Sequence, residues 1–127
     1  MGNAETKHSI LLVEDEVLLA LMLEDLLLDS GYRVTRATGL TDALELVERT
    51  QFDVAILDVN LGGIEVFPLA TRLQELRIPF LFASAGDAAH IGSKFGDHPM
   101  ISKPYTIDEI QQSLGELLGT TSRTTTQ

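Results

Sequence analysis

Polar side chains stand directly after several short apolar runs of this sequence. They comprise three carboxylates, a hydroxyl and an ammonium: Glu14, Asp15, Asp58, Ser84 and Lys103. Three carboxylates in one place repel one another, and they are tolerated mainly where a divalent cation or an ammonium offsets their charge. Mg²⁺ suits such a group best, because it takes oxygen ligands and usually binds through one or two carboxylates, waters and a phosphate.

With magnesium in place, a carboxylate can attack a phosphoryl donor and form an aspartyl phosphate. Asp58 is the nucleophile that we favour, because it stands alone after its run, whereas Glu14 and Asp15 are neighbours suited to hold the metal. Lys103 would offset the charge of the transferred group, and Ser84 could donate a hydrogen bond to one of its oxygens. A lone acid after a strand is more often a cap or turn residue, so this interpretation depends on all five groups converging.

Apolar runs that alternate with helical patterns predict the elements that would position these groups. Three strong runs and two weaker ones are predicted to be strands, at residues 10–13, 54–57, 80–83, 33–37 and 100–102. Between them, apolar residues three and four apart predict helices at 17–30, 41–50, 64–75 and 107–118. Residues 86–99 contain three glycines, so the fourth helix of the series is expected to be short or mobile.

This β-α alternation with near-continuous apolar strands predicts a doubly wound parallel sheet that is covered on both faces. We expect an α/β, flavodoxin-like fold with five parallel strands in the order 2-1-3-4-5. In such sheets the ligand site lies beyond the carboxyl ends of the strands, where the polar residues stand. The predicted domain covers residues 8–118, and the Thr-rich residues 119–127 are expected to form a disordered polar tail.

Charge and composition narrow the choice of partners. The 127 residues carry a formal charge of −10, which repels phosphate backbones and anionic lipids, so neither nucleic acid nor a membrane is expected as a partner. The longest apolar segment, 17–28, is too short to cross a bilayer and contains Glu24 and Asp25. The chain has no cysteine, which permits a reducing compartment, and a cytoplasmic location is expected.

Four motifs at the predicted strand ends resemble the receiver domains of two-component response regulators, the CheY-like family. They are Val13-Glu14-Asp15-Glu16, Leu57-Asp58-Val59-Asn60, Phe82-Ala83-Ser84-Ala85 and Ser102-Lys103-Pro104-Tyr105. The resemblance covers residues 8–118, and it implies that Asp58 accepts a phosphoryl group from a histidine kinase or a histidine phosphotransfer protein. Such a domain is not an enzyme, and it has at most intrinsic self-phosphorylation and self-dephosphorylation.

The same resemblance implies roles for the other residues. Magnesium would be held by Glu14, Asp15, Asp58 and the backbone carbonyl of Asn60. Ser84 would be the switch hydroxyl and Lys103 the contact to the phosphoryl group, with a cis peptide between Lys103 and Pro104. The segment 78–84 is similar to a subgroup of stand-alone receivers with a Phe-Ala-Thr-Gly signature, although Ser84 and Ala85 replace the threonine and the glycine.

Two further expectations concern signalling. Many receivers have an aromatic residue where Met100 stands, so the signal is expected to pass instead through order and disorder of residues 86–99. In the first predicted helix, one stripe is expected to face the core: Leu19, Met22, Leu23, Leu26 and Leu27. Val17, Leu21 and Leu28 would then face away, and by resemblance they would dock the histidine kinase or phosphotransfer protein. Scattered surface leucines, which are common, are the alternative.

The same residues bear on two rival functions. A small phosphohydrolase with an aspartyl-phosphate intermediate would need an acid two residues after the nucleophile, where Asn60 stands. A ligand-binding module without phosphorylation is disfavoured by the full set of five groups. A downstream protein target, a phosphate-sink role and a weak homodimer remain open.

Overall fold

Five of the apolar segments form the central sheet. The computed structural model describes residues 8–58, 60–61, 64–84, 100–102 and 106–126. The strands of the sheet are β1 (Ser9–Val13), β2 (Arg33–Ala37), β3 (Val54–Asp58), β6 (Phe80–Ser84) and β7 (Met100–Ser102). They lie in the order β2-β1-β3-β6-β7 and every neighbouring pair is parallel. The predicted α/β fold and its 2-1-3-4-5 order are therefore confirmed.

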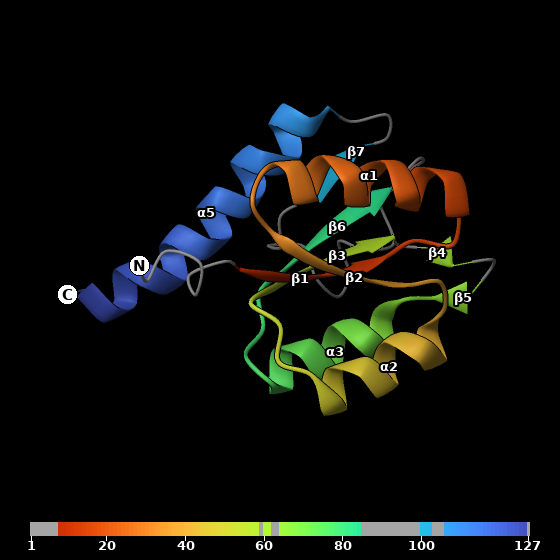
Figure 1. Ribbon diagram of the computed structural model, residues 1–127. Helices are drawn as coiled ribbons and strands as arrows, with labels where there is room; N and C mark the ends of the chain where they lie inside the picture. Colours follow the sequence, from red (N-terminus) through yellow and green to blue (C-terminus); the bar gives the residue numbers. More distant parts are fainter. Residues whose placement is uncertain (1–7, 59, 62–63, 85–99, 103–105, 127) are drawn as a thin grey trace.

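Helices cover both faces of this sheet (Figure 1). They are α1 (Val17–Asp29), α2 (Leu40–Arg49), α3 (Phe67–Glu75) and α5 (Ile107–Thr126). Helices α1 and α5 pack on one face, and α2 and α3 pack on the other. The fourth helix expected within residues 86–99 lies outside the described residues. Within the described part of the chain, no helix combines the length and the apolarity that a membrane span needs.

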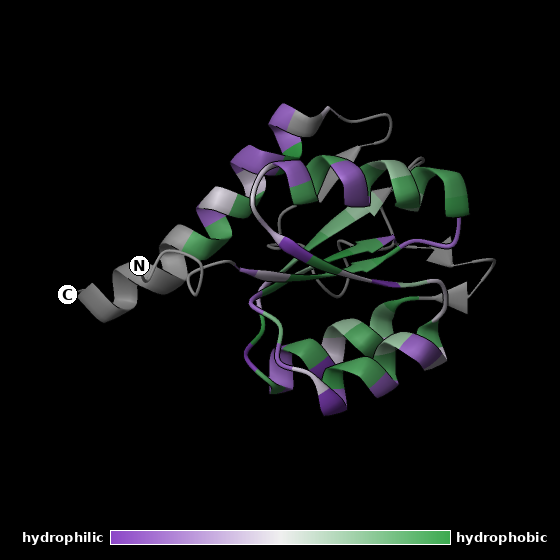
Figure 2. Cartoon of the chain, in the orientation of Figure 1, coloured by the Kyte–Doolittle hydropathy of each residue, from purple (hydrophilic) through white to green (hydrophobic). Residues whose placement is uncertain are grey.

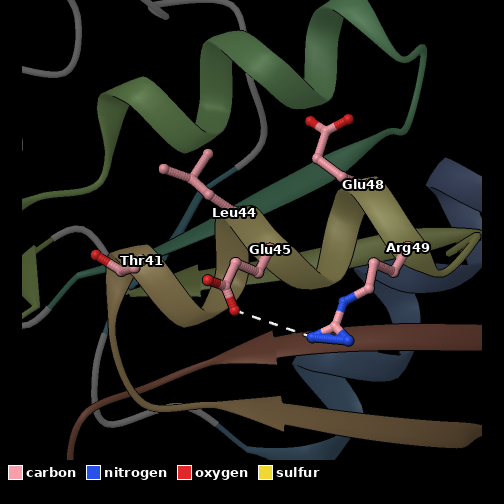
Figure 3. Close-up of a pocket in the computed structure, with 5 residues that line it drawn as sticks. All are labelled: Thr41, Leu44, Glu45, Glu48 and Arg49. Atoms are coloured by element: carbon pink, nitrogen blue, oxygen red, sulfur yellow. Dashed lines mark ion pairs between the residues drawn. The ribbon is translucent and has the colours of Figure 1, made fainter.

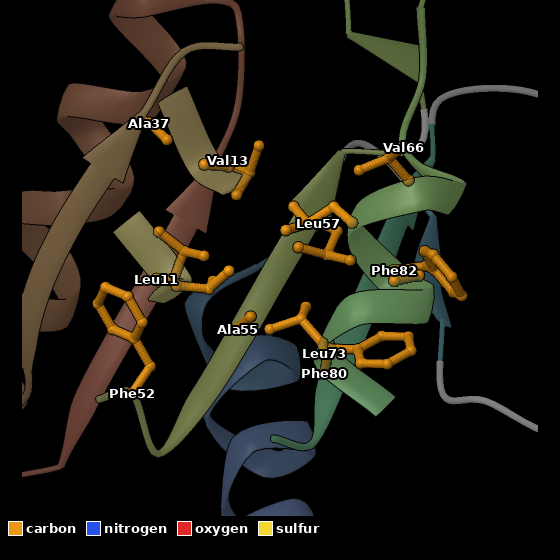
Figure 4. Close-up of a cluster of buried hydrophobic side chains, with 14 of the residues drawn as sticks. Leu11, Val13, Ala37, Phe52, Ala55, Leu57, Val66, Leu73, Phe80 and Phe82 are labelled. Carbon is orange, nitrogen blue, oxygen red and sulfur yellow. The ribbon is translucent and has the colours of Figure 1, made fainter. Parts of the chain in front are cut away.

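Side chains of β1, β3 and β6 alternate between two cores, which explains why these strands are continuous apolar runs. Leu11, Val13 and Leu57 belong to the core under α2 and α3, part of which is drawn in Figure 4. Leu12, which lies between Leu11 and Val13, and Ile56, which directly precedes Leu57, belong to the core under α1 and α5. The strands β1, β3 and β6 are thus buried on both sides and held in one register, whereas β2, at the edge of the sheet, is only partly buried.

Helix α3 begins at Phe67, so the prediction of a helix from Ile64 was wrong. Ile64–Glu65 form β5, which pairs antiparallel with β4 (Asn60–Leu61) directly after the central strand. A segment of two residues is too short for its pattern to tell a strand from a helix, and here pairing with β4 makes it a strand. Pro68 lies in the first turn of α3, where its missing N–H costs no helical hydrogen bond.

Helix α5 continues beyond Leu118, where the sequence analysis set the end of the domain. Residues 119–126 are helical, whereas their Thr-rich composition predicted a disordered polar tail. Threonine has a low helix propensity, so composition alone does not predict this continuation. Leu117 and Leu118 are the last described side chains of α5, and both pack against the core. A domain boundary near residue 118 stays a prediction.

Candidate functional site

The register of the sheet places two acids side by side. Val13 of β1 pairs with Leu57 of β3, so Glu14 and Asp58 lie one residue further along neighbouring strands. The N–H of Glu14 still donates to the carbonyl of Ala37, at 3.1 Å, which continues the pairing with β2. Because side chains alternate along a strand, Glu14 and Asp58 both fall on the face covered by α1 and α5.

Asp15 completes a group of three carboxylates at this edge. One oxygen from each of Glu14, Asp15 and Asp58 lies within 4.8 Å of the other two. Glu14 is 2% exposed and Asp58 is 7% exposed, while Asp15 is half-buried. Burial makes an ionised carboxylate costly unless other groups offset its charge. The structure thus brings together the three acids that the sequence analysis singled out.

Backbone groups at the start of α1 meet this cluster. The N–H of Glu16 donates a hydrogen bond to Oε2 of Glu14, at 3.2 Å, and α1 begins at the next residue. The N-terminal end of a helix carries partial positive charge, which favours nearby anions. The chain segment that follows β1 therefore both supplies two acids and stabilises one of them.

The donor set fits a hard divalent cation. Ligand oxygens on opposite sides of a six-coordinate Mg²⁺ stand about 4.2 Å apart, since each Mg–O bond is about 2.1 Å. The three carboxylates are close enough to share one such ion, with a small side-chain adjustment or a bridging water. Carboxylate oxygens alone suit magnesium better than zinc, which favours nitrogen and sulfur ligands. The acidic pocket can therefore bind a metal ion.

The other predicted site residues are described only in part. Asp58 pairs with Ala83 of β6, so the backbone of Ser84 lies one residue beyond it on the neighbouring strand. Asn60 is the first residue of β4 and follows Asp58 by two positions. Lys103 and Pro104, the predicted phosphoryl contact and cis peptide, lie outside the described residues. The roles of these residues stay predictions.

Helix α1 exposes more apolar surface than the sequence analysis assigned to it. Its exposed large apolar residues are Val17, Leu18, Leu21, Met22, Leu26 and Leu28. Val17, Leu21 and Leu28 were expected to be exposed, whereas the prediction that Met22 and Leu26 face the core was wrong. The buried residues are Ala20, Leu23 and Leu27. The helix begins with seven apolar residues in a row, so helical spacing could not select one face.

Leu18 was missed by the sequence analysis and is 84% exposed. Its place in the sequence could have indicated a role, because it lies three residues after Asp15 and so next to the acidic cluster. Leu21 and Met22, three and four residues further along the helix, are exposed as well, and a contiguous apolar patch of this kind is typical of a contact surface.

A surface hollow lies elsewhere on the molecule, on the outer side of α2. It has a volume of about 360 Å³ and is lined by Thr41, Leu44, Glu45, Glu48 and Arg49 (Figure 3). Its charges are already paired, since Arg49 lies 3.9 Å from Glu45 and Arg72 binds Glu48. Helix α2 packs on the opposite face of the sheet from α1, so this hollow is separate from the acidic cluster.

The fold and the acidic edge together define a receiver domain of a response regulator. Residues 10–115 match the family described as response regulator receiver domain. The chain belongs to this family, whose members are signalling domains of two-component systems and are generally not enzymes. Receiver domains interact with histidine kinases or phosphotransfer proteins.

Solved structures include similar proteins of nearly the same extent. SdrG from Sphingomonas melonis Fr1 is 42% identical, with a TM-score of 0.75, and the match covers 88% of this chain and 97% of SdrG. The BeF3-activated conformation of SdrG from Pseudomonas melonis Fr1 is also 42% identical, with a TM-score of 0.74, and the match covers 87% of this chain and 95% of that chain. A response regulator receiver protein from Sinorhizobium medicae WSM419 is 25% identical, with a TM-score of 0.82. The match covers 91% of this chain and 97% of that protein's chain.

Curated relatives are longer. The uncharacterized transcriptional regulatory protein YbdJ of Bacillus subtilis is 30% identical over 116 residues, which are 87% of this chain and 51% of YbdJ. The transcriptional regulatory protein YvrH of the same organism is 33% identical over 102 residues, 76% of this chain and 43% of YvrH. The chain thus spans about half the length of the curated relatives it matches.

Proposed function

We propose that this chain works as a stand-alone receiver that accepts a phosphoryl group on Asp58. The donor is the phosphohistidine of a histidine kinase or of a phosphotransfer protein in the cytoplasm. The observation that carries the proposal is the cluster of Glu14, Asp15 and Asp58, in which Asp58 is 93% buried at the end of the central strand. The match to 97% of the SdrG chain supports the stand-alone reading.

In this proposal an oxygen of Asp58 attacks the phosphorus atom in line with the phosphorus–nitrogen bond of the donor. That bond breaks, and its electron pair stays on the imidazole nitrogen. Burial of Asp58 and its strand-end position hold the attacking oxygen in place and keep bulk water away. Magnesium, when bound, would neutralise charge on the transferring group. Glu14, Asp15 and the carbonyl of Asn60 would hold it together with Asp58.

Two predicted side chains would act on the transferred group. Ser84 would donate a hydrogen bond to one phosphoryl oxygen, because its backbone lies one residue beyond Asp58 on the adjacent strand. Lys103, the residue after β7, would offset the added negative charge. Slow loss of the phosphoryl group to water would return the domain to its resting state, and the output would pass to a downstream protein, or the chain would serve as a phosphate sink.

The proposed docking surface for the donor lies on α1. Val17, Leu21 and Leu28 are 54%, 42% and 49% exposed, and α1 begins two residues after Asp15. We predict that Leu21→Glu slows transfer from a cognate kinase by at least tenfold, because a carboxylate would have to be buried at the interface. Thr41→Glu, on the exposed side of α2, should leave the rate unchanged. Undiminished transfer to the Leu21→Glu protein would remove this docking surface.

Reaction with Mg²⁺ and acetyl phosphate tests the proposed function. A stable adduct on the peptide that contains Asp58, read by mass spectrometry, supports a receiver. Rapid multiple turnover would indicate a phosphohydrolase, and no reaction would indicate a ligand-binding module. Asp58→Asn should abolish the adduct, whereas Asp42→Asn, which removes an exposed acid from α2, should keep it.

A further inference from the structure

A second hollow lies at the opposite end of the sheet from the acidic cluster. It has a volume of about 250 Å³ and is lined by Val47, residues 50–52 and residues 76–78. These residues belong to the connection from α2 to β3 and the connection from α3 to β6, both of which carry hydrophobic and hydrophilic residues (Figure 2). Phe52 and Asp58 stand at the two ends of β3, so about 20 Å of extended chain separates the hollow from the acidic cluster.

The floor of this hollow is apolar. Val47 and Phe52 are buried, and Leu76 and Ile78 pack against the core to which they belong. Such a floor favours the apolar part of a ligand, because covering it releases water from apolar surface. The volume of about 250 Å³ is below the range of about 300–1,000 Å³ that is usual for drug-sized ligands, so a ligand of this hollow would be small.

The rim of the hollow carries positive charge, although the chain as a whole is acidic. Arg77 is exposed at the rim, and Thr50 and Gln51 can each donate a hydrogen bond there. None of the seven lining residues is acidic, whereas the chain has 19 Asp and Glu against 9 Lys and Arg. Within the described residues Arg77 makes no ion pair, while Arg49 and Arg72 are paired with glutamates. The rim therefore suits a negatively charged group.

The backbone at Arg77 is costly for an arginine. Its φ is 62°, in the left-handed region that glycine adopts most readily. Arg77 closes α3 in a Schellman motif, in which the N–H of Ile78 donates to the carbonyl of Leu73 at 2.9 Å. Helix α1 ends in the same motif, with Gly31 at the corresponding position and a φ of 98°. Since glycine serves this turn with less strain, the turn does not explain the arginine, and a ligand for its side chain does.

We propose that this hollow binds a small monocarboxylate whose body is apolar, such as a single ring or a branched chain. The guanidinium of Arg77 would bind the carboxylate, Thr50 would donate a further hydrogen bond, and the apolar body would cover the floor. The C-terminal ends of α2 and α3 carry partial negative charge, which disfavours a multiply charged anion such as phosphate. This inference goes beyond the proposed function and does not depend on Asp58.

Benzoate and benzamide test this inference, because they have nearly the same shape and differ in charge. We expect benzoate to shift the NMR signals of Val47, Phe52 and Ile78 along one saturable curve and to bind about tenfold or more tightly than benzamide. Acetate, which lacks the apolar body, should bind more weakly than benzoate. The Arg77→Gly protein should lose the preference for benzoate while unfolding at the same or a higher urea concentration, since glycine suits the turn. Arg49→Gln removes an exposed arginine that does not line the hollow, and it should leave the preference intact.

Several results would overturn the inference. They are equal binding of benzoate and benzamide, a preference for benzoate that survives in Arg77→Gly, and no shift of the three signals with benzoate at about 10 mM. Acetate that binds as tightly as benzoate would overturn it too, because the floor would then contribute nothing. Benzoate shifts at Glu14 and Asp58 in place of the hollow would place the anion elsewhere and would also count against it.

Discussion

Removing one charge from the acidic cluster should stabilise the metal-free protein. Asp58→Asn replaces a buried carboxylate with a neutral side chain of the same shape, and it leaves Glu14 and Asp15 in place. The substitution therefore removes repulsion without creating a cavity. In the presence of EDTA we expect the Asp58→Asn protein to be harder to unfold than the wild type.

The distances in the cluster set the size of this effect. Two unit charges 4.8 Å apart repel by about 3.5 kcal/mol at an effective dielectric constant of 20 and by about 0.9 kcal/mol in water. Asp15 is half-buried and neighbouring hydrogen bonds offset part of the repulsion, so we expect a net gain of about 1–2 kcal/mol in the free energy of unfolding. Magnesium at ten times its dissociation constant would stabilise the wild type by about 1.4 kcal/mol, which would cancel most of that difference.

Urea unfolding followed by circular dichroism measures both quantities. The midpoint for Asp58→Asn should exceed that of the wild type in EDTA, and the gap should close when Mg²⁺ is added. Asp42→Asn serves as the control, because it removes an acid from the first turn of α2 and should not stabilise the protein in either buffer. A gain of the same size with and without Mg²⁺, or no gain in EDTA, would refute the electrostatic reasoning.

Three further predictions concern the scaffold. Hydrogen bonding from Arg72 lowers the pKa of Glu48 below its ordinary value of 4.5. The ion pair therefore stabilises the fold fully above pH 4.5. This stabilisation is lost as the pH falls through the lowered pKa that Glu48 has in the folded protein. Arg72→Met should return the NMR titration of Glu48 to about 4.5 and remove that pH dependence; an unchanged titration would contradict it. Phe82→Leu should lower the free energy of unfolding, measured with urea, by about 1–2 kcal/mol. Phe82 is fully buried, and its ring centroid lies 5.3 Å from that of Phe80 in an edge-to-face arrangement. A smaller loss would mean that the core repacks around the leucine. Glu24→Gln should cost about 0.5–1 kcal/mol through its partly exposed ion pair with Arg36, and this cost should shrink in high salt.

Much of the fold could be predicted because strands that are buried on both faces appear in the sequence as continuous apolar runs. The runs ending at Val13 and Leu57 are apolar at every position, since their side chains enter two cores in turn. Such runs place the acids that follow them at one edge, because parallel strands end together. The positions of Glu14 and Asp58 therefore followed from counting residues after each run.

Other features depend on contacts that a single segment does not specify. Ile64–Glu65 became a strand because Asn60–Leu61 offers it an antiparallel partner, and a two-residue segment does not by itself specify a strand. Met22 was expected to be buried, but α1 is apolar on all sides along its first two turns. The sheet, and not the periodicity of the helix, selected the face that contains Leu23 and Leu27.

Titration of the protein with Mg²⁺ tests the central claim most directly. If the three carboxylates form one metal site, the NMR signals of Glu14, Asp15 and Asp58 should move together along a single saturable binding curve. In the Asp58→Asn protein that curve should weaken strongly, while Asp42→Asn should bind as the wild type does. Signals at the cluster that ignore Mg²⁺, or a response that Asp58→Asn leaves unchanged, would contradict a magnesium-assisted phosphoacceptor at this position.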